Sequence, residues 1–366
     1  MTRHVWLLGG TGKVGDHAAR LLVAEGLEVT TVSRRSANPG RSYRHISLDL
    51  ATPETALPVQ VGDIAVNLTE ATSTEHILSI LQHGAAFLET SATAEYVLPK
   101  REAVRVANLP GTLVDCVGVA PGLTNLMAHE MRRAHPNLRH LHIGGELGLG
   151  EHAGAAATRW FLASLGAATT AKIDADWQKV PTGFLSQKFP FQKGRSSRLA
   201  VGFPFVEQAL LAQEFGNDVE SVLTYLAFSP PWVTRLLWTA LRLGMGPLAS
   251  RKADGLTRLL LRVPQIGETS TRVVVTGKDD DGHSAWLRLE TGEQSRATAA
   301  IVVATTLAFD PARPMSISSI ADWLSLDDAV AVLKQTHAQT RMTRSNEVER
   351  DAVTAKSGQN TKEATL

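Results

Sequence analysis

The chain has 366 residues, of which 43% are hydrophobic and 20% are charged, and its formal net charge at pH 7 is +1. This length exceeds what one compact core usually holds, so two domains are expected, and the near-zero charge argues against a nucleic-acid partner. The single cysteine, Cys116, excludes an internal disulfide, and neither a signal-peptide pattern nor a membrane-spanning apolar run is evident, so a reducing, cytoplasmic location is expected.

Strands and helices alternate over the first 120 residues. The run 4–8 (HVWLL) ends at a glycine, as a buried parallel strand would, and a helical pattern over 16–25 follows it. Further strands are expected at 28–33, 45–50, 64–68, 86–90 and 112–119. Helices over 76–83 and 100–108 separate the later strands. This alternation predicts an α/β fold with a doubly wound parallel sheet, a Rossmann domain over residues 1–122.

The pattern changes after residue 122. Helices at 123–134 and 153–165, a strand at 138–143 and a hairpin formed by 271–278 and 284–290 indicate a second, α+β domain over 123–295. Apolar helical patterns at 296–307 and 320–335 predict helices in a C-terminal segment over 296–336. The polar segment 337–366 is expected to be a disordered tail.

Three glycines follow the first strand at a spacing of three: Gly9, Gly12 and Gly15. In a strand–turn–helix unit, the first glycine permits the tight turn, the second lets the backbone approach a pyrophosphate, and the third allows close helix packing. The helix N-terminus then offers N–H groups and a partial positive charge to the phosphates. The turn thus predicts a dinucleotide site, and a plain tight turn is the alternative. Its predicted residues are Gly9, Gly10, Thr11, Gly12, Lys13, Val14 and Gly15.

The end of the second strand bears on the choice of cofactor. A carboxylate there would bind the ribose 2′-hydroxyl of NAD, but the chain has Ser33, Arg34 and Arg35. A hydroxyl and two guanidinium groups suit a 2′-phosphate, which favours NADP over NAD; a solvated basic loop is the alternative. Asp49 is expected near the adenine amino group, and Asn67 near the nicotinamide ribose.

Three motifs that resemble catalytic ones are interpreted as structural. Tyr96 and Lys100 have the spacing of the short-chain dehydrogenase pair, but Pro99 disfavours the continuous helix that this pair needs. His140 and His142 share one face of a strand without an obvious third ligand, so no metal site is predicted. Cys116 is expected to be buried and inert.

Several segments resemble the saccharopine dehydrogenase/reductase-like family: GGTGKVGDHAARLL, VNLTEATSTEHILSILQHGAAFLETSA and GTLVDCVGVAPGLTNLMAHEM. The resemblance implies a Rossmann domain, an α+β domain that often supports dimerisation, and C-terminal helices over 296–336 that return to the Rossmann domain. It also implies hydride transfer to or from a C–N bond of an amino-acid-derived imine. The chain departs from this family at Ala120, where saccharopine reductases have an acid, and at Glu89, within FLETS, where relatives often have Y-x-D-T-S. These departures leave the substrate open.

A second substrate is expected beyond the carboxyl ends of the parallel strands. Ser91, Gly118 and the Pro121–Gly122 turn should line this region, and the segment 144–160 should face it with Glu146, Glu151, His152 and Arg159. His152 is the candidate acid, Arg159 the candidate carboxylate anchor, and Ser91 a further candidate catalytic residue. A polar loop that caps a helix is the alternative.

The stretch 225–263 is rich in tryptophan, leucine and arginine. Such a stretch can lie on a membrane surface or hold a lipid, and an ordinary helix pair over the core is the alternative.

The sequence therefore predicts an NADPH-dependent oxidoreductase of the saccharopine dehydrogenase-like type, homodimeric, with a small-molecule substrate and candidate lipid contact. An enoyl or carbonyl reductase of a lipidic substrate is one alternative. A non-catalytic NADP-binding sensor or scaffold is another.

Overall fold

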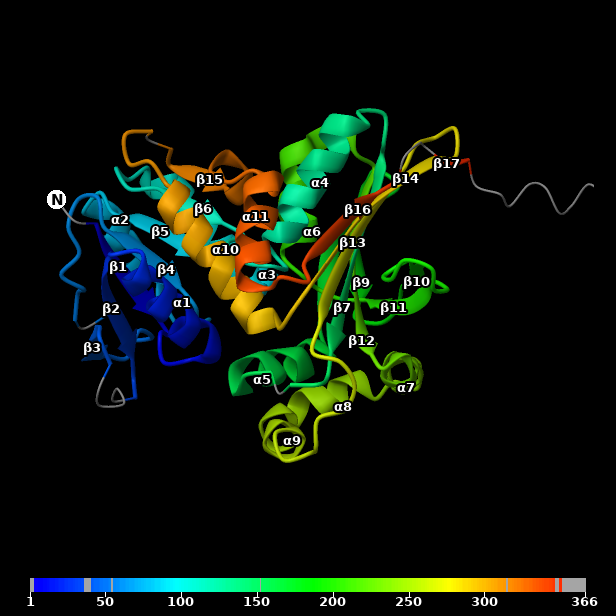
Figure 1. The fold of residues 1–366 in the computed structure, drawn as a ribbon, viewed down its shortest axis with the longest axis horizontal. Coiled ribbons are helices and arrows are strands. Elements are labelled where there is room, and N and C mark those ends of the chain that lie inside the picture. The colour runs from blue at the N-terminus through cyan, green and yellow to red at the C-terminus, as the bar shows by residue number, and fades with distance from the viewer. Residues whose placement is uncertain are drawn as a thin grey trace, which may run out of the picture.

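The computed structural model describes residues 3–35, 41–53, 55–151, 153–313, 315–345 and 349–350. Its N-terminal part is a sheet of seven parallel strands in the order β15-β6-β5-β4-β1-β2-β3 (Figure 1). The strands are β1 (His4–Leu8), β2 (Glu28–Ser33), β3 (Arg44–Ser47), β4 (Ile64–Asn67), β5 (Ala86–Glu89), β6 (Leu113–Asp115) and β15 (Ile317–Ser319). The predicted doubly wound parallel sheet is confirmed, and its strand order reverses between β1 and β4.

Helices cover both faces of this sheet. Helices α1 (Lys13–Ala24) and α10 (Gln294–Ala308) pack against each other on one face, and α2 (Thr74–Gln82) and α3 (Ala94–Ala107) cover the other. Side chains of β1 alternate accordingly: Val5 and Leu7 join the α1 and α10 side, whereas Trp6 and Leu8 join the α2 side. Burial on both faces explains why the four residues of β1 after His4 are all apolar.

The second part is a mixed sheet in the order β10-β11-β12-β7-β13-β14-β16, in which β12 and β7 are parallel. Strands β8 and β9 extend it from β12, and β17 pairs with β14. The strands are β7 (His140–Gly148), β8 (Ala168–Ile173), β9 (Asp176–Pro181), β10 (Ser186–Phe189), β11 (Arg198–Gly202), β12 (Ser221–Ser229), β13 (Thr271–Lys278), β14 (His283–Thr291), β16 (Arg341–Arg344) and β17 (Glu349–Arg350).

Helices of the second part separate the two sheets or cover the lower edge of the molecule (Figure 1). Helices α4 (Leu123–Ala134), α6 (Glu207–Phe215) and α11 (Leu326–Thr336) contribute to a core shared by both parts. The lower group comprises α5 (Ala155–Ser164), α7 (Pro231–Arg242), α8 (Gly246–Arg251) and α9 (Ala253–Leu260). No helix in the described ranges is long and apolar enough to cross a bilayer.

The C-terminal segment differs from its expectation at one place. The tail was expected to be disordered from residue 337, yet β16 pairs with β14 and Met342 packs against the shared core. Its four residues carry one large apolar side chain, which is too little for a sequence pattern to show a strand. Residues 351–366 of the expected tail lie outside the described residues.

Two further expectations fail for reasons of context. Pro99 lies inside α3, which begins at Ala94 and not near residue 100; the helix tolerates the lost backbone hydrogen bond because the side chains of Val97 and Val104 are buried on its inner face. The stretch 225–263 is not one surface element, because 225–229 belong to β12, a fully buried strand.

Candidate functional site

The turn after β1 has the geometry that a pyrophosphate requires. Gly9 has φ +85°, a left-handed conformation that favours glycine. Helix α1 then begins directly after Gly12, and no side chain caps its N-terminus. The turn lies beside the point where the strand order reverses, so first-turn N–H groups of α1 point toward the carboxyl edge of the sheet.

The glycines of this turn differ in the space around them. A Cβ on Gly10 would lie 2.7 Å from the Thr31 side chain, and one on Gly15 would lie 2.5 Å from Gly10 Cα. A Cβ on Gly12 would meet only Gly9 O, at 3.5 Å. Gly10 and Gly15 are thus required by the protein itself, whereas at Gly12 the protein leaves the space open.

The end of β2 presents two exposed guanidinium groups. The backbone carbonyls of Arg34 and Arg35 accept hydrogen bonds from Ser47 Oγ (3.4 Å) and Ser33 Oγ (3.0 Å), which fixes the backbone. Both arginine side chains are exposed, and in the described part of the chain neither has an ion pair. Asp49, by contrast, uses its carboxylate to accept from Ala51 N (3.1 Å) and so caps a local turn.

A buried polar network lies at the ends of β4 and β5. Asn67 Nδ2 donates to both carboxyl oxygens of Glu89 (3.0 and 2.8 Å) and to the Tyr96 hydroxyl (3.1 Å), and Asn67 Oδ1 accepts from Thr72 (2.7 Å). The Ser91 N–H donates to Glu89 Oε1 (2.8 Å). Asn67 is fully buried, and its side chain is occupied by these partners. The ribose contact expected of Asn67 remains a prediction.

Glu89 is the titratable group that sequence reasoning missed as a functional candidate. Burial raises its pKa to about 7, against the opposing effect of the Asn67 and Ser91 donors. Beside it, the hydroxyl of Ser91 is buried without a hydrogen-bond partner of good geometry among the described residues. An acid that ends a buried parallel strand was the available signal, because that position lies at the ligand-binding edge.

Tyr96 and Lys100 do share one helix, so the reason for dismissing this pair was wrong. Lys100 Nζ lies 4.0 Å from the centroid of the Tyr96 ring. The Tyr96 hydroxyl donates instead to Thr72 O (3.0 Å). Burial and the nearby Glu89 raise the pKa of Tyr96 above its usual range. The tyrosine therefore stabilises the Asn67 network and holds its proton firmly.

The PGLTN segment enters the second part through a tight loop. Gly122 has φ +135°, and its N–H donates to Asn125 Oδ1 (2.9 Å) at the start of α4. Thr124, two residues after Gly122, donates a hydrogen bond from its hydroxyl to Glu207. Burial raises the pKa of Glu207 to about 8. On the sheet side, burial raises the pKa of Asp115 to about 6 despite its contact with Arg101 (2.8 Å). Cys116 is buried, and its thiol pKa is raised.

Two contacts join the second part to the ligand-binding edge. Lys13, the first residue of α1, pairs with Glu151 (2.9 Å) in the loop after β7. Trp160 of α5 donates its indole N–H to Thr93 Oγ1 (2.7 Å), two residues beyond Ser91. The Trp160 ring packs on two phenylalanines of the second part. Ala92 and Ala120 pack against the same cluster, so apolar and aromatic side chains gather beside the residue that follows Ser91. The phenylalanines are Phe203 and Phe205.

Other residues of the segment 144–160 do not take the places expected of them. Glu146 is fully buried and binds Arg198 (2.8 Å) and Arg272 (2.7 Å), so it is an internal ion-pair residue. Arg159 pairs with Asp254 (2.6 Å) on α9, with both side chains more than half exposed, and does not join the Ser91 network. His152 lies outside the described residues.

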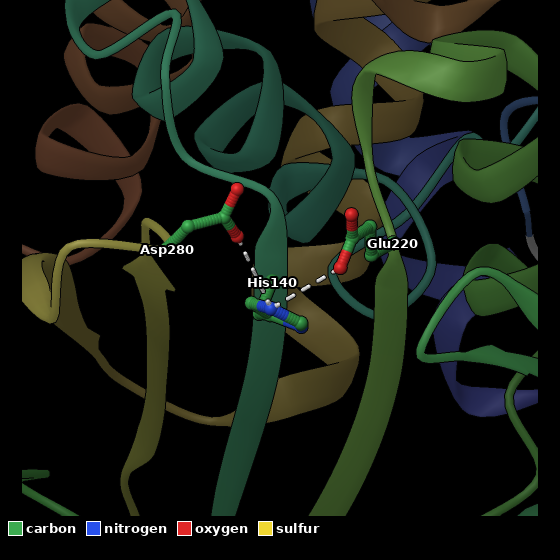
Figure 2. Close-up of side chains that lie close together, drawn as sticks. All are labelled: His140, Glu220 and Asp280. Atoms are coloured by element: carbon green, nitrogen blue, oxygen red, sulfur yellow. Dashed lines mark ion pairs between the residues drawn. The ribbon is translucent and has the colours of Figure 1, made fainter.

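His140 belongs to a separate cluster. Its Nε2 lies 3.7 Å from Glu220 Oε2 and 4.0 Å from Asp280 Oδ1 (Figure 2). Glu220 immediately precedes β12 and Asp280 lies in the turn between β13 and β14, so the sequence pattern did not reveal these acidic neighbours. Arg139 Nη2 already binds Glu220 (2.7 Å). The cluster is at the start of β7, about 26 Å from the end that faces the glycine turn, and is not part of the carboxyl edge of the parallel sheet.

A comparison with protein-family models finds no match, and a comparison with curated proteins finds none that is significant. Among solved structures, the chain is similar to apo saccharopine dehydrogenase (L-Glu forming) from Saccharomyces cerevisiae, with 15% identity, 94% of this chain and 100% of that chain covered, and a TM-score of 0.60. The two chains share a fold. This fold combines a Rossmann-type parallel sheet with a second, mixed sheet, as the sequence resemblance implied.

Two other solved structures align over similar lengths but much less closely. Myo-inositol dehydrogenase from Corynebacterium glutamicum has 11% identity, 95% of this chain and 100% of that chain covered, and a TM-score of 0.41. GenD2 from gentamicin A biosynthesis, solved in complex with NAD, has 14% identity, 94% and 97% coverage, and a TM-score of 0.37.

Proposed function

We propose that the chain is an NADPH-dependent oxidoreductase that uses the carboxyl edge of its parallel sheet. One observation carries this proposal: the uncapped turn at Gly9–Gly15 lies at the reversal point of a seven-stranded Rossmann sheet, with open space at Gly12. Bound there, a nicotinamide dinucleotide supplies or accepts the hydride. The N–H groups of α1 hold its pyrophosphate, and the guanidinium groups of Arg34 and Arg35 bind a 2′-phosphate.

The proton is assigned to the buried network beside Ser91. Burial raises the pKa of Glu89 to about 7, so its acid and its carboxylate forms are both accessible near neutral pH. Asn67 orients both carboxyl oxygens of Glu89. Ser91, whose hydroxyl has no hydrogen-bond partner of good geometry in the described structure, contacts the substrate. A carboxyl group with this pKa suits general acid–base catalysis of a reduction at pH 7.

Two substrate classes follow. The sequence resemblance favours an amino-acid-derived imine, but Arg159, the expected carboxylate anchor, is paired with Asp254. The apolar cluster at Trp160, Ala92 and Ala120 instead favours an apolar carbonyl or enoyl substrate. We expect turnover with an aliphatic enoyl thioester or aldehyde to exceed turnover with mixtures of amines and 2-oxo acids. NADPH binding without turnover of any of these substrates would favour the sensor alternative.

Replacement of Arg34 tests the cofactor assignment. Arg34→Ala should raise the NADPH dissociation constant about 10- to 100-fold, because a charge-assisted contact to the 2′-phosphate is lost, and should leave that of NADH unchanged. Fluorescence titration of both nucleotides measures this. Arg44→Ala, at the amino end of the neighbouring strand β3, is the control. Equal losses for the two nucleotides would contradict 2′-phosphate recognition.

A further inference from the structure

The segment 231–266 concentrates the exposed apolar surface of the protein. Of the fourteen large apolar side chains that are exposed within the described residues, nine belong to it. These are Trp232, Leu236, Leu243, Met245, Leu248, Leu259, Leu260, Val263 and Ile266. Trp232 is 55% and Leu243 74% exposed, so this surface is too apolar to be ordinary solvated helix.

The same segment is strongly basic. It carries six arginine or lysine residues and one acid, Asp254, which is already paired with Arg159. The basic residues are Arg235, Arg242, Arg251, Lys252, Arg258 and Arg262. Helices α7, α8 and α9, which hold most of them, lie along the lower edge of the molecule (Figure 1).

A basic pocket opens beside α7. Its volume is about 850 Å³, and Lys188, Arg195 and Arg235 line it together with Ser196 and Ser197. None of these three cations has an ion pair in the described part of the chain. On α7, Arg235 is followed by Leu236, so the pocket wall and the exposed apolar stripe are about 100° apart around one helix.

We propose that the surface formed by residues 231–266 docks on an anionic phospholipid membrane, with the pocket beside α7 holding a phosphate-bearing headgroup. Exposed tryptophan and leucine enter the interface while the cations meet anionic headgroups. A second copy of the chain fits less well, because a two-fold contact would place the basic residues against themselves. The inference is independent of the nucleotide site.

The same helices reach the candidate active site. The apolar cluster that Trp160 and Ala92 pack against is also contacted by α7 and α9, through Val233, Leu237, Leu241 and Leu256. A docked membrane therefore lies on one side of the cluster, and Ala92, the residue after Ser91, packs against the same cluster. This arrangement suits an apolar substrate taken from the bilayer.

Vesicle co-flotation of the full chain tests the docking surface. We expect binding to phosphatidylcholine–phosphatidylglycerol vesicles, little binding to phosphatidylcholine alone, and weakening at high salt. The double charge reversal Arg235→Glu/Arg258→Glu should lower partitioning at least tenfold, since each basic residue near an anionic surface contributes about fivefold. Trp232→Ser/Leu236→Ser should lower it similarly.

Matched controls change equally exposed residues elsewhere. Val106→Ser/Leu307→Ser and Lys179→Glu/Lys334→Glu should bind vesicles as the unmodified chain does, and NADPH titration of every variant should be unchanged. Equal binding to both vesicle types, or unchanged binding after charge reversal, overturns the proposal. So does binding of inorganic phosphate without vesicle binding, or self-association that only Trp232→Ser/Leu236→Ser abolishes.

Discussion

The glycine turn and the Glu89 network meet at one edge of the same sheet, yet they are built by opposite means. The turn uses backbone: small residues, an uncapped helix and open space at Gly12. The network uses side chains, in which Asn67, Glu89 and Tyr96 satisfy one another in a buried setting. The proposed phosphate site is thus built from a few adjacent residues, whereas the raised pKa of Glu89 depends on burial by residues distant in sequence.

The largest expected effect separates two glycines within the turn. Gly15→Ala should destabilise the protein by about 2 kcal/mol or more, because the new Cβ would lie 2.5 Å from Gly10 Cα. Gly12→Ala should leave the melting temperature unchanged and weaken NADPH binding at least tenfold. Thermal unfolding and nucleotide titration of both variants measure the difference. A Gly12→Ala protein that binds NADPH normally would place the pyrophosphate elsewhere.

Next in size is the effect of neutralising the buried acid. Glu89→Gln should lower kcat about 100-fold or more, as expected for loss of a general acid, with nucleotide dissociation constants within about twofold of the original. The reduction rate should fall as pH rises through about 7, because the acid form is lost, and this limb should be absent in the variant. Glu70→Gln, exposed at the same edge, is the control. An unchanged pH profile would remove Glu89 from the reaction.

The smallest effect concerns Glu207, a buried acid to which no role in the reaction is assigned. Its folded pKa of about 8 lies above the unfolded value, so its contribution to stability is complete below about pH 4.5 and is lost as pH rises toward 8. The melting temperature of Glu207→Gln, taken relative to that of the unmodified chain at the same pH, should therefore be about 3 °C higher at pH 8 than at pH 5. Glu95→Gln, an exposed change, should show no such difference. Parallel melting curves for both variants would indicate that Glu207 is ionised in the folded protein.

What the sequence predicted follows the same division between local and long-range structure. The roles of Gly9 and Gly15 can be inferred from the residues next to them. Apolar runs such as 4–8 and 64–68 indicate buried strands even when the strands they pair with are unknown. Strand β15 has a single large apolar residue, Ile317, and is recognisable only by its pairing with β6. The Asn67–Glu89 contact joins residues 22 apart, and Glu146 meets Arg272 across 126 residues, so no spacing rule could predict either pair.

Strand β16 determines how far the chain can be shortened from its C-terminal end without exposing a strand of the second sheet. It is the edge strand of the second sheet and covers residues 287–290 of β14. A truncation at residue 337, where the sequence loses its apolar pattern, would bare the backbone N–H and C=O groups of that strand. Bare strands recruit further strands from other molecules. Strand β16, which looks dispensable from its composition, thus protects the edge of the second sheet from pairing with other molecules. A shortened variant should keep the chain through residue 350.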